Sequence, residues 1–116
     1  MRFARLMNNT KWEDIRLGMY SLGDMSPKWR TKDVENQHIC EWDGDWFYHF
    51  RIGAYGCIEW LEIATTSAEQ SVAVGAVLQS IRVPGEQVGS VFRIFGYAPI
   101  GKVIDYLAPA NKIKKP

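Results

Sequence analysis

Residues 39–63 decide the predicted fold; they read ICEWDGDWFYHFRIGAYGCIEWLEI. Asp43-Gly44 separates two aromatic-rich runs, which is typical of a two-residue type I′ turn because both central residues must take a positive φ. A second turn is predicted at 53–56, where two glycines precede a third apolar run. The stretch therefore predicts consecutive antiparallel strands at about 39–42, 45–52 and 57–63.

The flanking segments predict two helices and further strands. Thr10 and Glu13 fit a capping box that starts an amphipathic helix at about 11–22. Thr66 and Glu69 fit a second capping box, before an apolar helical stripe that Val83-Pro84-Gly85 ends. Weaker alternation predicts strands at 28–34, 91–97 and 102–107. The predicted order is α-β-β-β-β-α-β-β, an α+β fold with two helices and a mostly antiparallel sheet of about five to six strands.

The composition fits one soluble domain over residues 1–116. The chain is 47% hydrophobic, and no run approaches the eighteen apolar residues of a membrane span. The first six residues are too short for a signal peptide, so the two cysteines are expected as reduced thiols in the cytoplasm. We expect an ordered body at about 7–108 and short basic tails at both ends, among them Arg2, Arg5, Lys112, Lys114 and Lys115.

The charge is nearly balanced over the whole chain but not within it. The formal net charge is +1, whereas residues 7–111 hold 9 basic and 13 acidic residues. A mildly acidic body disfavours binding to nucleic acid, which needs a basic face. It favours a basic protein as partner.

The predicted hairpin registers sort the central strands into two faces. The first is the predicted core face, with Ile39, Trp46, Tyr48, Phe50, Ile52, Cys57, Leu61 and Ile63. The second is aromatic yet polar, with His38, Cys40, Trp42, Phe47, His49, Arg51, Ile58, Trp60 and Glu62.

Three interpretations of the second face stay open. In the first, a helix or the last hairpin covers it. In the second, it is a protein-binding patch, because Trp, Tyr and Arg concentrate binding energy at interfaces; its contact residues are Trp42, Phe47, His49, Arg51 and Trp60. In the third, His38, Cys40 and His49 hold a metal ion, although no fourth ligand is evident.

Other chemical templates are not matched. The serines lack a nucleophile-elbow sequence, and the glycines form neither a GxxxxGK[ST] nor a GxGxxG phosphate loop. Asp43 and Asp45 flank a turn, and turn chemistry explains them more simply than acid–base catalysis. We therefore expect no catalytic residues and no cofactor.

Several segments carry a resemblance to a known family. They are residues 7–12 (MNNTKW), 26–32 (SPKWRTK), 42–50 (WDGDWFYHF), 58–60 (IEW), 83–85 (VPG) and 92–97 (FRIFGY). Over about residues 7–107 the chain resembles a family of small bacterial proteins classed as a domain of unknown function. The resemblance implies a bacterial origin and a compact single domain, and it implies no activity.

The leading hypothesis is a cytoplasmic, non-enzymatic protein-interaction module. Its narrower form is a toxin-neutralising immunity-type protein with a basic toxin as partner, and a second copy of the chain is the other expected partner. The alternative is a small-molecule-binding protein or minor enzyme with a cleft near His38 and His49. A homodimer through the sheet face or through an edge strand at 91–97 is the third possibility.

Overall fold

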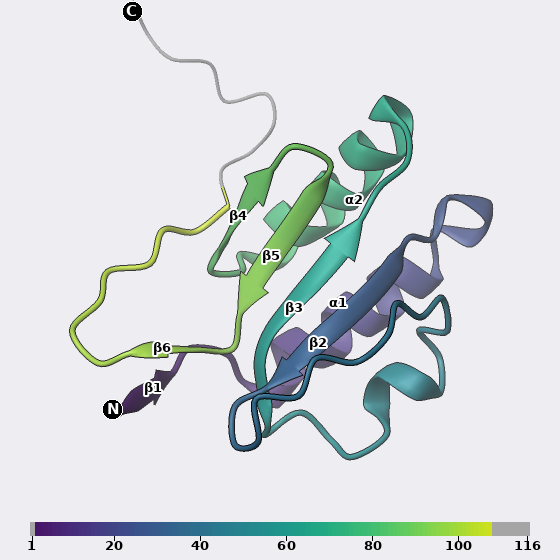
Figure 1. Cartoon of the computed structure of the whole chain (residues 1–116). Helices are drawn as coiled ribbons and strands as arrows, with labels where there is room; N and C mark the ends of the chain where they lie inside the picture. Colours follow the sequence, from purple (N-terminus) through teal and green to yellow (C-terminus); the bar gives the residue numbers. More distant parts are fainter. Residues whose placement is uncertain (1, 108–116) are drawn as a thin grey trace, which may run out of the picture.

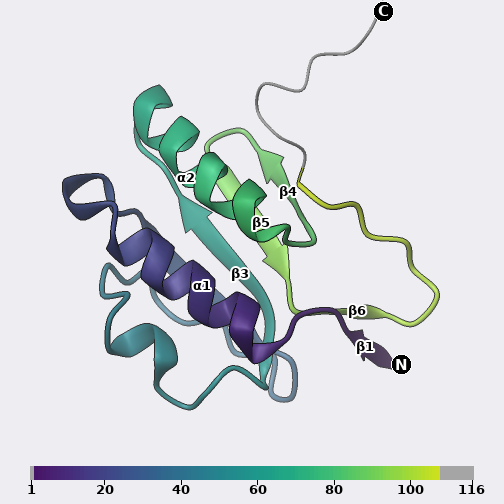
Figure 2. The same cartoon turned by 180° about the vertical axis from the view of Figure 1, so that it is seen from behind.

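A four-stranded antiparallel sheet forms the centre of the molecule (Figure 1). The computed structural model describes residues 2–107. The strands lie in the order β2-β3-β5-β4, with bounds Lys28–Asp33, Ile58–Ala64, Val91–Phe95 and Gly85–Val88. Helices α1 (Asn9–Tyr20) and α2 (Ala68–Ile81) both lie on one face of this sheet (Figure 2). A separate two-stranded sheet joins β1 (Phe3–Arg5) to β6 (Tyr97–Pro99).

The predicted α+β class is confirmed, but the predicted order is not. The observed order is β1, α1, β2, β3, α2, β4, β5 and β6, with short 3-10 helices at Gly23–Met25 (η1) and His49–Arg51 (η2). Two differences account for most of the change. No strand forms at 39–52, and residues 3–5, expected in a basic tail, form β1.

Side-chain caps set the beginnings of both helices. Asn8 caps α1 by accepting a hydrogen bond from the Lys11 amide (2.8 Å), so the helix begins before Thr10, the cap predicted from the sequence. Ser67 caps α2 by accepting from the Gln70 amide (3.0 Å). Lys11 Nζ donates to the Arg82 carbonyl just after α2 (2.7 Å), and the two helices lie antiparallel (Figure 2).

The core lies between the helices and the sheet. It also receives aromatic side chains from the long connection between β2 and β3. Each helix contributes apolar side chains toward β3 and β5, and a Cβ at Gly18 would collide with Val77 where the helices meet. The largest fully buried side chains include Trp12, Ile15, Met19, Trp46, Leu61, Ile63, Val74, Leu78 and Ile94.

The predicted hairpin at Asp43-Gly44 is wrong. Neither residue has the positive φ that a type I′ turn requires. Instead, Asp43 Oδ1 accepts from the Asp45 amide (2.7 Å), and Asp45 Oδ1 accepts from the Tyr48 amide (2.9 Å). These side-chain acceptors take backbone donors that a strand would have used, and they turn the chain toward η2.

The core assignment within this connection is partly wrong for a related reason. Trp46 and Phe50 are buried as predicted, whereas Tyr48, Ile52 and Ile39 are exposed. Positions four residues apart share a face in both a strand and a helical turn, so Trp46 and Phe50 fit either pattern. Tyr48 and Ile52 distinguish the two, and their exposure excludes the strand.

The C-terminal part of the sheet also differs from the prediction. Residues 102–107 form no strand; they contact residues 83–85 through a bridge between Tyr106 and Pro84. Because β5 lies between β3 and β4, it cannot serve as the edge strand predicted at 91–97. Lys112, Lys114 and Lys115 of the predicted basic tail lie outside the described residues. Over residues 2–107, no helix has the length and apolar character needed to cross a membrane.

Candidate functional site

The face of the four-stranded sheet opposite the helices is the candidate site, and we call it the open face. In Figure 1 it points toward the reader, with α1 and α2 behind the sheet. Strand alternation and the observed registers bring its side chains into three cross-strand rows, with Trp42 beside them. The open face comprises Lys28, Arg30, Lys32, Trp42, Trp60, Glu62, Ala64, Glu86, Val88, Val91, Arg93 and Phe95.

The middle row crosses all four strands with alternating charge. Arg30 of β2 pairs with Glu62 of β3, Glu62 with Arg93 of β5, and Arg93 with Glu86 of β4. Arg30 Nε donates to Glu62 Oε1 (2.8 Å). Arg93 Nε donates to Glu62 Oε2 (3.0 Å), and Arg93 Nη2 donates to the same oxygen. Glu62 is therefore the shared acceptor of two arginines.

Two tryptophans stack against the guanidinium groups of these arginines. The Arg30 guanidinium lies over the Trp42 ring, 4.6 Å from its centroid, and that of Arg93 lies over Trp60, at 4.8 Å. Stacking of a guanidinium on an indole face is favourable and restricts the side chain. Trp60 is buried while Trp42 is 38% exposed, so the face keeps one accessible indole.

The arginines also fix the charge of Glu62. Burial alone would raise the pKa of this carboxyl, but the hydrogen bonds and positive charges of Arg93 and Arg30 outweigh it and hold the pKa below its usual value. Glu62 is therefore ionised near neutral pH. It acts as an anchor for both guanidinium groups and not as a proton donor.

A pocket of about 290 Å³ lies over this row. The middle row supplies its charged wall, and Trp42 supplies an aromatic one. Val88 and Val91, at the end of the β4–β5 hairpin, add apolar surface. The pocket thus combines a few converging polar groups with apolar walls, as binding sites do.

The structure divides the predicted contact face into two regions. Trp42 and Trp60 belong to the open face, whereas Phe47, His49 and Arg51 do not. Phe47 and Arg51 lie with Tyr20 and Tyr48 in a second cluster, which we call the loop patch. Phe47 packs on Tyr20 of α1 with ring centroids 5.1 Å apart, and the Arg51 guanidinium lies 5.8 Å from both Phe47 and Tyr48.

His49 is held by two carboxylates at the border of the loop patch. Its Nδ1 lies 2.8 Å from Asp43 Oδ2, and its Nε2 lies 3.7 Å from Asp45 Oδ2. The hydrogen bond to Asp43 and the negative charges of Asp43 and Asp45 raise the pKa of His49. The resulting ion pair is present at low pH and is lost as the pH rises through the raised pKa, which makes His49 a positioning group for residues 43–49.

The three candidate metal ligands lie along β2 but are not brought together. The Asp33 amide donates to the His38 carbonyl at one end of the strand, and Cys40 Sγ lies 3.3 Å from the Thr31 amide in the middle. His49 is held by Asp43, which forms a bridge with Trp29 at the other end. The backbone positions beside His38 and Asp43 are four strand residues apart, or ~13 Å. The sequence predicts a cleft near both His38 and His49. In the structure these two histidines lie beside opposite ends of β2.

The sequence comparisons identify a family without assigning an activity. A model of a family of unknown function, DUF6678, matches residues 1–101. The chain belongs to this family. Neither the search of curated proteins nor the search of solved structures gave a match for this DUF6678 protein.

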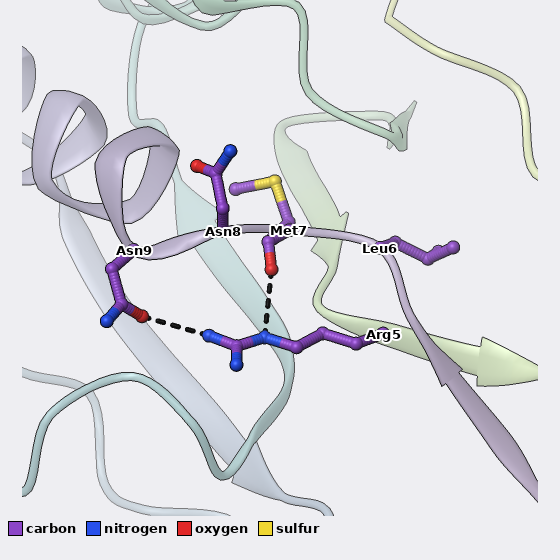
Figure 3. Close-up of a pocket in the computed structure, with 5 residues that line it drawn as sticks. All are labelled: Arg5, Leu6, Met7, Asn8 and Asn9. Carbon is purple, nitrogen blue, oxygen red and sulfur yellow. Dashed lines mark hydrogen bonds between the residues drawn. The ribbon is translucent and has the colours of Figure 1, made fainter.

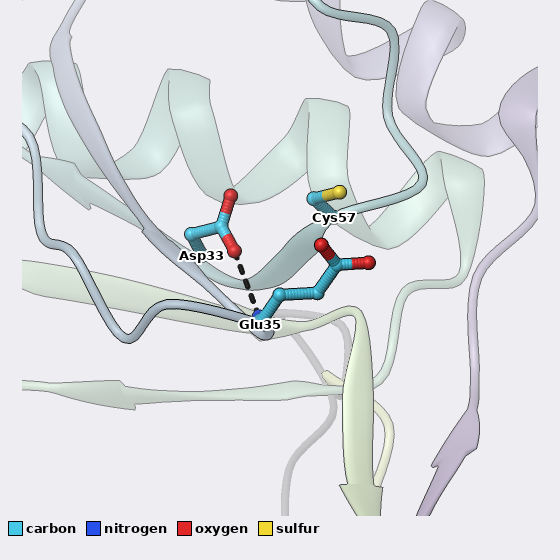
Figure 4. A group of neighbouring side chains, drawn as sticks. All are labelled: Asp33, Glu35 and Cys57. Carbon is cyan, nitrogen blue, oxygen red and sulfur yellow. Dashed lines mark hydrogen bonds between the residues drawn. The ribbon is translucent and has the colours of Figure 1, made fainter.

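A second cluster of ionisable groups in the DUF6678 chain lies at the start of β3. Potential ligand atoms of Asp33, Glu35 and Cys57 all lie within 4.8 Å of one another (Figure 4). Asp33 Oδ1 already accepts from the amides of Glu35 (2.7 Å) and Asn36 (3.1 Å). The negative charge of Glu35, then burial and the charge of Asp33, raise the pKa of the Cys57 thiol. Cys57 is thus a protonated thiol near neutral pH.

A larger hollow lies beside the segment that joins β1 to α1 (Figure 3). Its lining consists of five consecutive residues, Arg5 to Asn9. Arg5 is already engaged: its Nε donates to the Met7 carbonyl and its Nη2 to Asn9 Oδ1, each at 2.9 Å. The hollow follows from the path of the chain, and no set of chemical groups from different elements converges on it.

Arg30, Arg93 and Glu86 are not among the residues predicted for this face. Each lies on a strand that pairs across the sheet, and the wrong hairpin had placed residues 45–52 beside β3 instead of β2 and β5. A signal was present nonetheless. Glu62 and Arg93 each stand as a charged residue in the middle of an apolar strand, and their opposite charges indicate a cross-strand pair.

Proposed function

We propose that this DUF6678 protein is a non-enzymatic protein-interaction module that binds its partner through the open face. One observation carries the proposal: a sheet face without a covering helix presents two arginines, a tryptophan and apolar side chains around one pocket. Arg and Trp are enriched among the residues that dominate binding energy at protein interfaces. Trp42, stacked on Arg30 and still 38% exposed, supplies a rigid aromatic contact.

The chemistry of the face supports binding more than catalysis. Glu62 is its buried carboxylate, and the two arginines keep that group ionised. A carboxylate with a lowered pKa and both oxygens engaged is a poor general acid or base near neutral pH. The same groups are well suited to hold a fixed pattern of charge for a partner.

The cytoplasm of a bacterium is the compartment that we propose for this module. Cys40 and Cys57 are both free cysteines, which fits a reducing compartment. A toxin-neutralising role stays a prediction. The excess positive charge of the open face would repel a basic toxin, so such a partner would have to bind elsewhere on the acidic body.

Affinity capture with matched variants tests the proposal. Tagged wild-type protein, Trp42→Ala and Tyr48→Ala are incubated with lysate of the source organism, and the retained proteins are quantified by mass spectrometry. Tyr48 is an exposed aromatic residue of the loop patch and serves as the control. We expect a stoichiometric protein partner with wild type and with Tyr48→Ala, and its loss with Trp42→Ala.

Two results would overturn this assignment. Retention of the partner by folded Trp42→Ala, together with its loss from Tyr48→Ala, would move the interface to the loop patch. Absence of any partner for folded wild type would favour the small-molecule hypothesis. Light scattering after size-exclusion chromatography determines whether the partner is a second copy of the chain.

A further inference from the structure

We infer that the open face binds an acidic segment of a partner protein, with Arg30 and Arg93 pairing with its carboxylates. The inference rests on the proposed function, because it specifies the partner of the same face. Its basis is the unused hydrogen-bonding capacity of the two guanidinium groups, their rigid placement and the charge around them.

The two arginines have donors left over after binding Glu62. A guanidinium has five N–H donors in a planar fork. Arg30 uses its Nε on Glu62, which leaves both of its terminal nitrogens, and Arg93 uses Nε and Nη2, which leaves Nη1. Within residues 2–107, no other hydrogen bond from either side chain is present. Their side chains are 35% and 39% exposed, so these donors can reach a ligand.

Both guanidinium groups are held in place before any ligand binds. Glu62 fixes the Nε edge of each, and Trp42 and Trp60 fix one planar side of each. A ligand therefore meets donors that lose little further conformational freedom on binding. Arginines arranged in this way suit carboxylates, which accept two parallel hydrogen bonds from one fork.

The surrounding charge favours an anionic ligand. The open face carries four basic residues, Lys28, Arg30, Lys32 and Arg93, against the two acidic residues Glu62 and Glu86. Lys32 Nζ also lies 3.8 Å from Glu59 Oε1, which leaves a formal excess of one positive charge. Residues 7–111 as a whole have 9 basic and 13 acidic residues. The open face thus has a small excess of positive charge on an otherwise acidic body.

The small size of this positively charged area and its apolar border favour a peptide over a nucleic acid. Nucleic acids bind through many phosphate contacts along an extended basic surface, and the acidic body opposes such binding. Trp42, Val88 and Val91 around the pocket offer apolar contacts to the side chains between acidic residues of an extended peptide. In extended segments alternate side chains point the same way, so a peptide of alternating acidic and apolar residues matches the site.

Fluorescence anisotropy with defined probes tests the inference. The ligands are a labelled peptide of alternating glutamate and leucine, the same peptide with glutamine in place of glutamate, and a labelled thymidylate oligonucleotide. We expect the glutamate peptide to bind wild type at least about tenfold more tightly than the glutamine peptide, since hydrogen bonds to charged groups are the stronger ones. The oligonucleotide is expected to bind more weakly than the glutamate peptide.

Arginine variants assign the binding to the open face. Arg30→Gln and Arg93→Gln should each weaken binding of the glutamate peptide by about tenfold. Arg51→Gln is the matched control, because Arg51 is an exposed arginine of the loop patch; it should change the affinity by less than about twofold. Thermal unfolding checks that each variant is folded. If Arg93→Gln is unfolded, Arg30→Lys takes its place, since it keeps the charge and loses the planar fork.

The outcomes separate this inference from the proposed function. An equal loss of affinity in Arg51→Gln and Arg30→Gln, tighter binding of the oligonucleotide than of the peptide, or no binding of the glutamate peptide would each overturn the inference. A partner that is captured from lysate and lost in Trp42→Ala would then still support the proposed function. If the glutamate peptide does not bind and no partner is captured either, both the inference and the proposed function are overturned.

Discussion

Both faces of β3 are buried, but by different means. Leu61 and Ile63 point toward the helices and are completely buried. Trp60 and Glu62, their neighbours in sequence, point the other way and are only 8% and 5% exposed. Apolar side chains of α1, α2 and β5 cover the first pair, whereas arginine side chains on the surface cover the second.

This difference separates a permanent core from a cover that can respond to a partner. Helix packing excludes water from Leu61 and Ile63 through many apolar contacts, and nothing short of unfolding removes it. Arg30 and Arg93 cover Glu62 and Trp60 through hydrogen bonds and stacking, and their outer edges remain in water. An acidic ligand can bind those edges without disturbing the fold.

The largest expected effect comes from the helix-covered face. Leu61→Ala removes a completely buried side chain between β3 and the helices and leaves a cavity there. We expect the free energy of unfolding to fall by about 3 kcal/mol. Urea unfolding followed by circular dichroism measures it. The loss should be the same at pH 7 and pH 4, because no titrating group is removed; a strong dependence on pH would contradict the comparison.

A smaller and pH-dependent effect is expected on the open face. Glu62→Gln keeps the shape of the side chain but removes the charge shared by Arg30 and Arg93. We expect a loss of about 1–3 kcal/mol in the free energy of unfolding at pH 7, since the partners are charged groups that remain partly hydrated. The same urea experiment measures it.

The pH dependence of that loss follows from the lowered pKa of Glu62. A carboxyl whose pKa is lower in the folded than in the unfolded protein stabilises the fold above its unfolded pKa. This stabilisation disappears as the pH falls through the lowered pKa of the folded state. The difference between wild type and Glu62→Gln should therefore shrink in acid, and a difference that stays constant down to pH 2 would show that packing, not charge, accounts for it.

The sequence alone could predict the alternation of β3 but not its neighbours. Alternation predicts Leu61 and Ile63 inward and Trp60 and Glu62 outward, because it is a local property of a regular strand. It fails at Ile58, predicted outward, which packs in the core beside the register shift between Lys32 and Asp33. The partners of Glu62 come from β2 and β5, which lie about thirty residues before and after it in the chain. The register between strands so far apart in sequence depends on the whole fold. The wrong prediction of a local hairpin was therefore enough to leave both arginines out of the predicted site.

Residues 43–51 show the other reason for failure. Their aromatic content and Asp43-Gly44 favour a hairpin, yet the carboxylates of Asp43 and Asp45 bind nearby backbone amides and start a turn. Competition between side-chain and backbone acceptors is decided by small free-energy differences that depend on burial of the neighbouring rings. Trp46, whose indole donates to the buried Pro27 carbonyl (2.8 Å), favours the turn because it places that ring in the core.

A still smaller effect on stability is expected from the exposed indole of the open face. Trp42→Ala removes the ring on which Arg30 stacks but leaves the hydrogen bond from Arg30 to Glu62 in place. The free energy of unfolding should fall by about 0.5–1 kcal/mol. Tyr48→Ala is the control with an exposed ring outside this face. A loss as large as that of Leu61→Ala would mean that Trp42 belongs to the core and cannot act as a binding residue.

The smallest effect is expected at the start of β3, where the carboxylates of Asp33 and Glu35 lie close to Cys57. Among residues 2–107, no ion pair is found for Asp33 or Glu35, in contrast with Glu62 and its two arginines. The charges of Glu35 and Asp33, together with partial burial of the thiol itself, raise the pKa of Cys57. Glu35→Gln, made in a Cys40→Ser background, removes the largest cause and should speed alkylation of Cys57 by iodoacetamide several-fold at pH 8, because the thiolate is the reactive form. Mass spectrometry follows the rate, and Glu41→Gln, an exposed carboxylate that does not act on Cys57, should leave it unchanged. An unchanged rate in Glu35→Gln would mean that partial burial, not unpaired charge, sets the reactivity of this thiol, and charge would then matter on the open face alone.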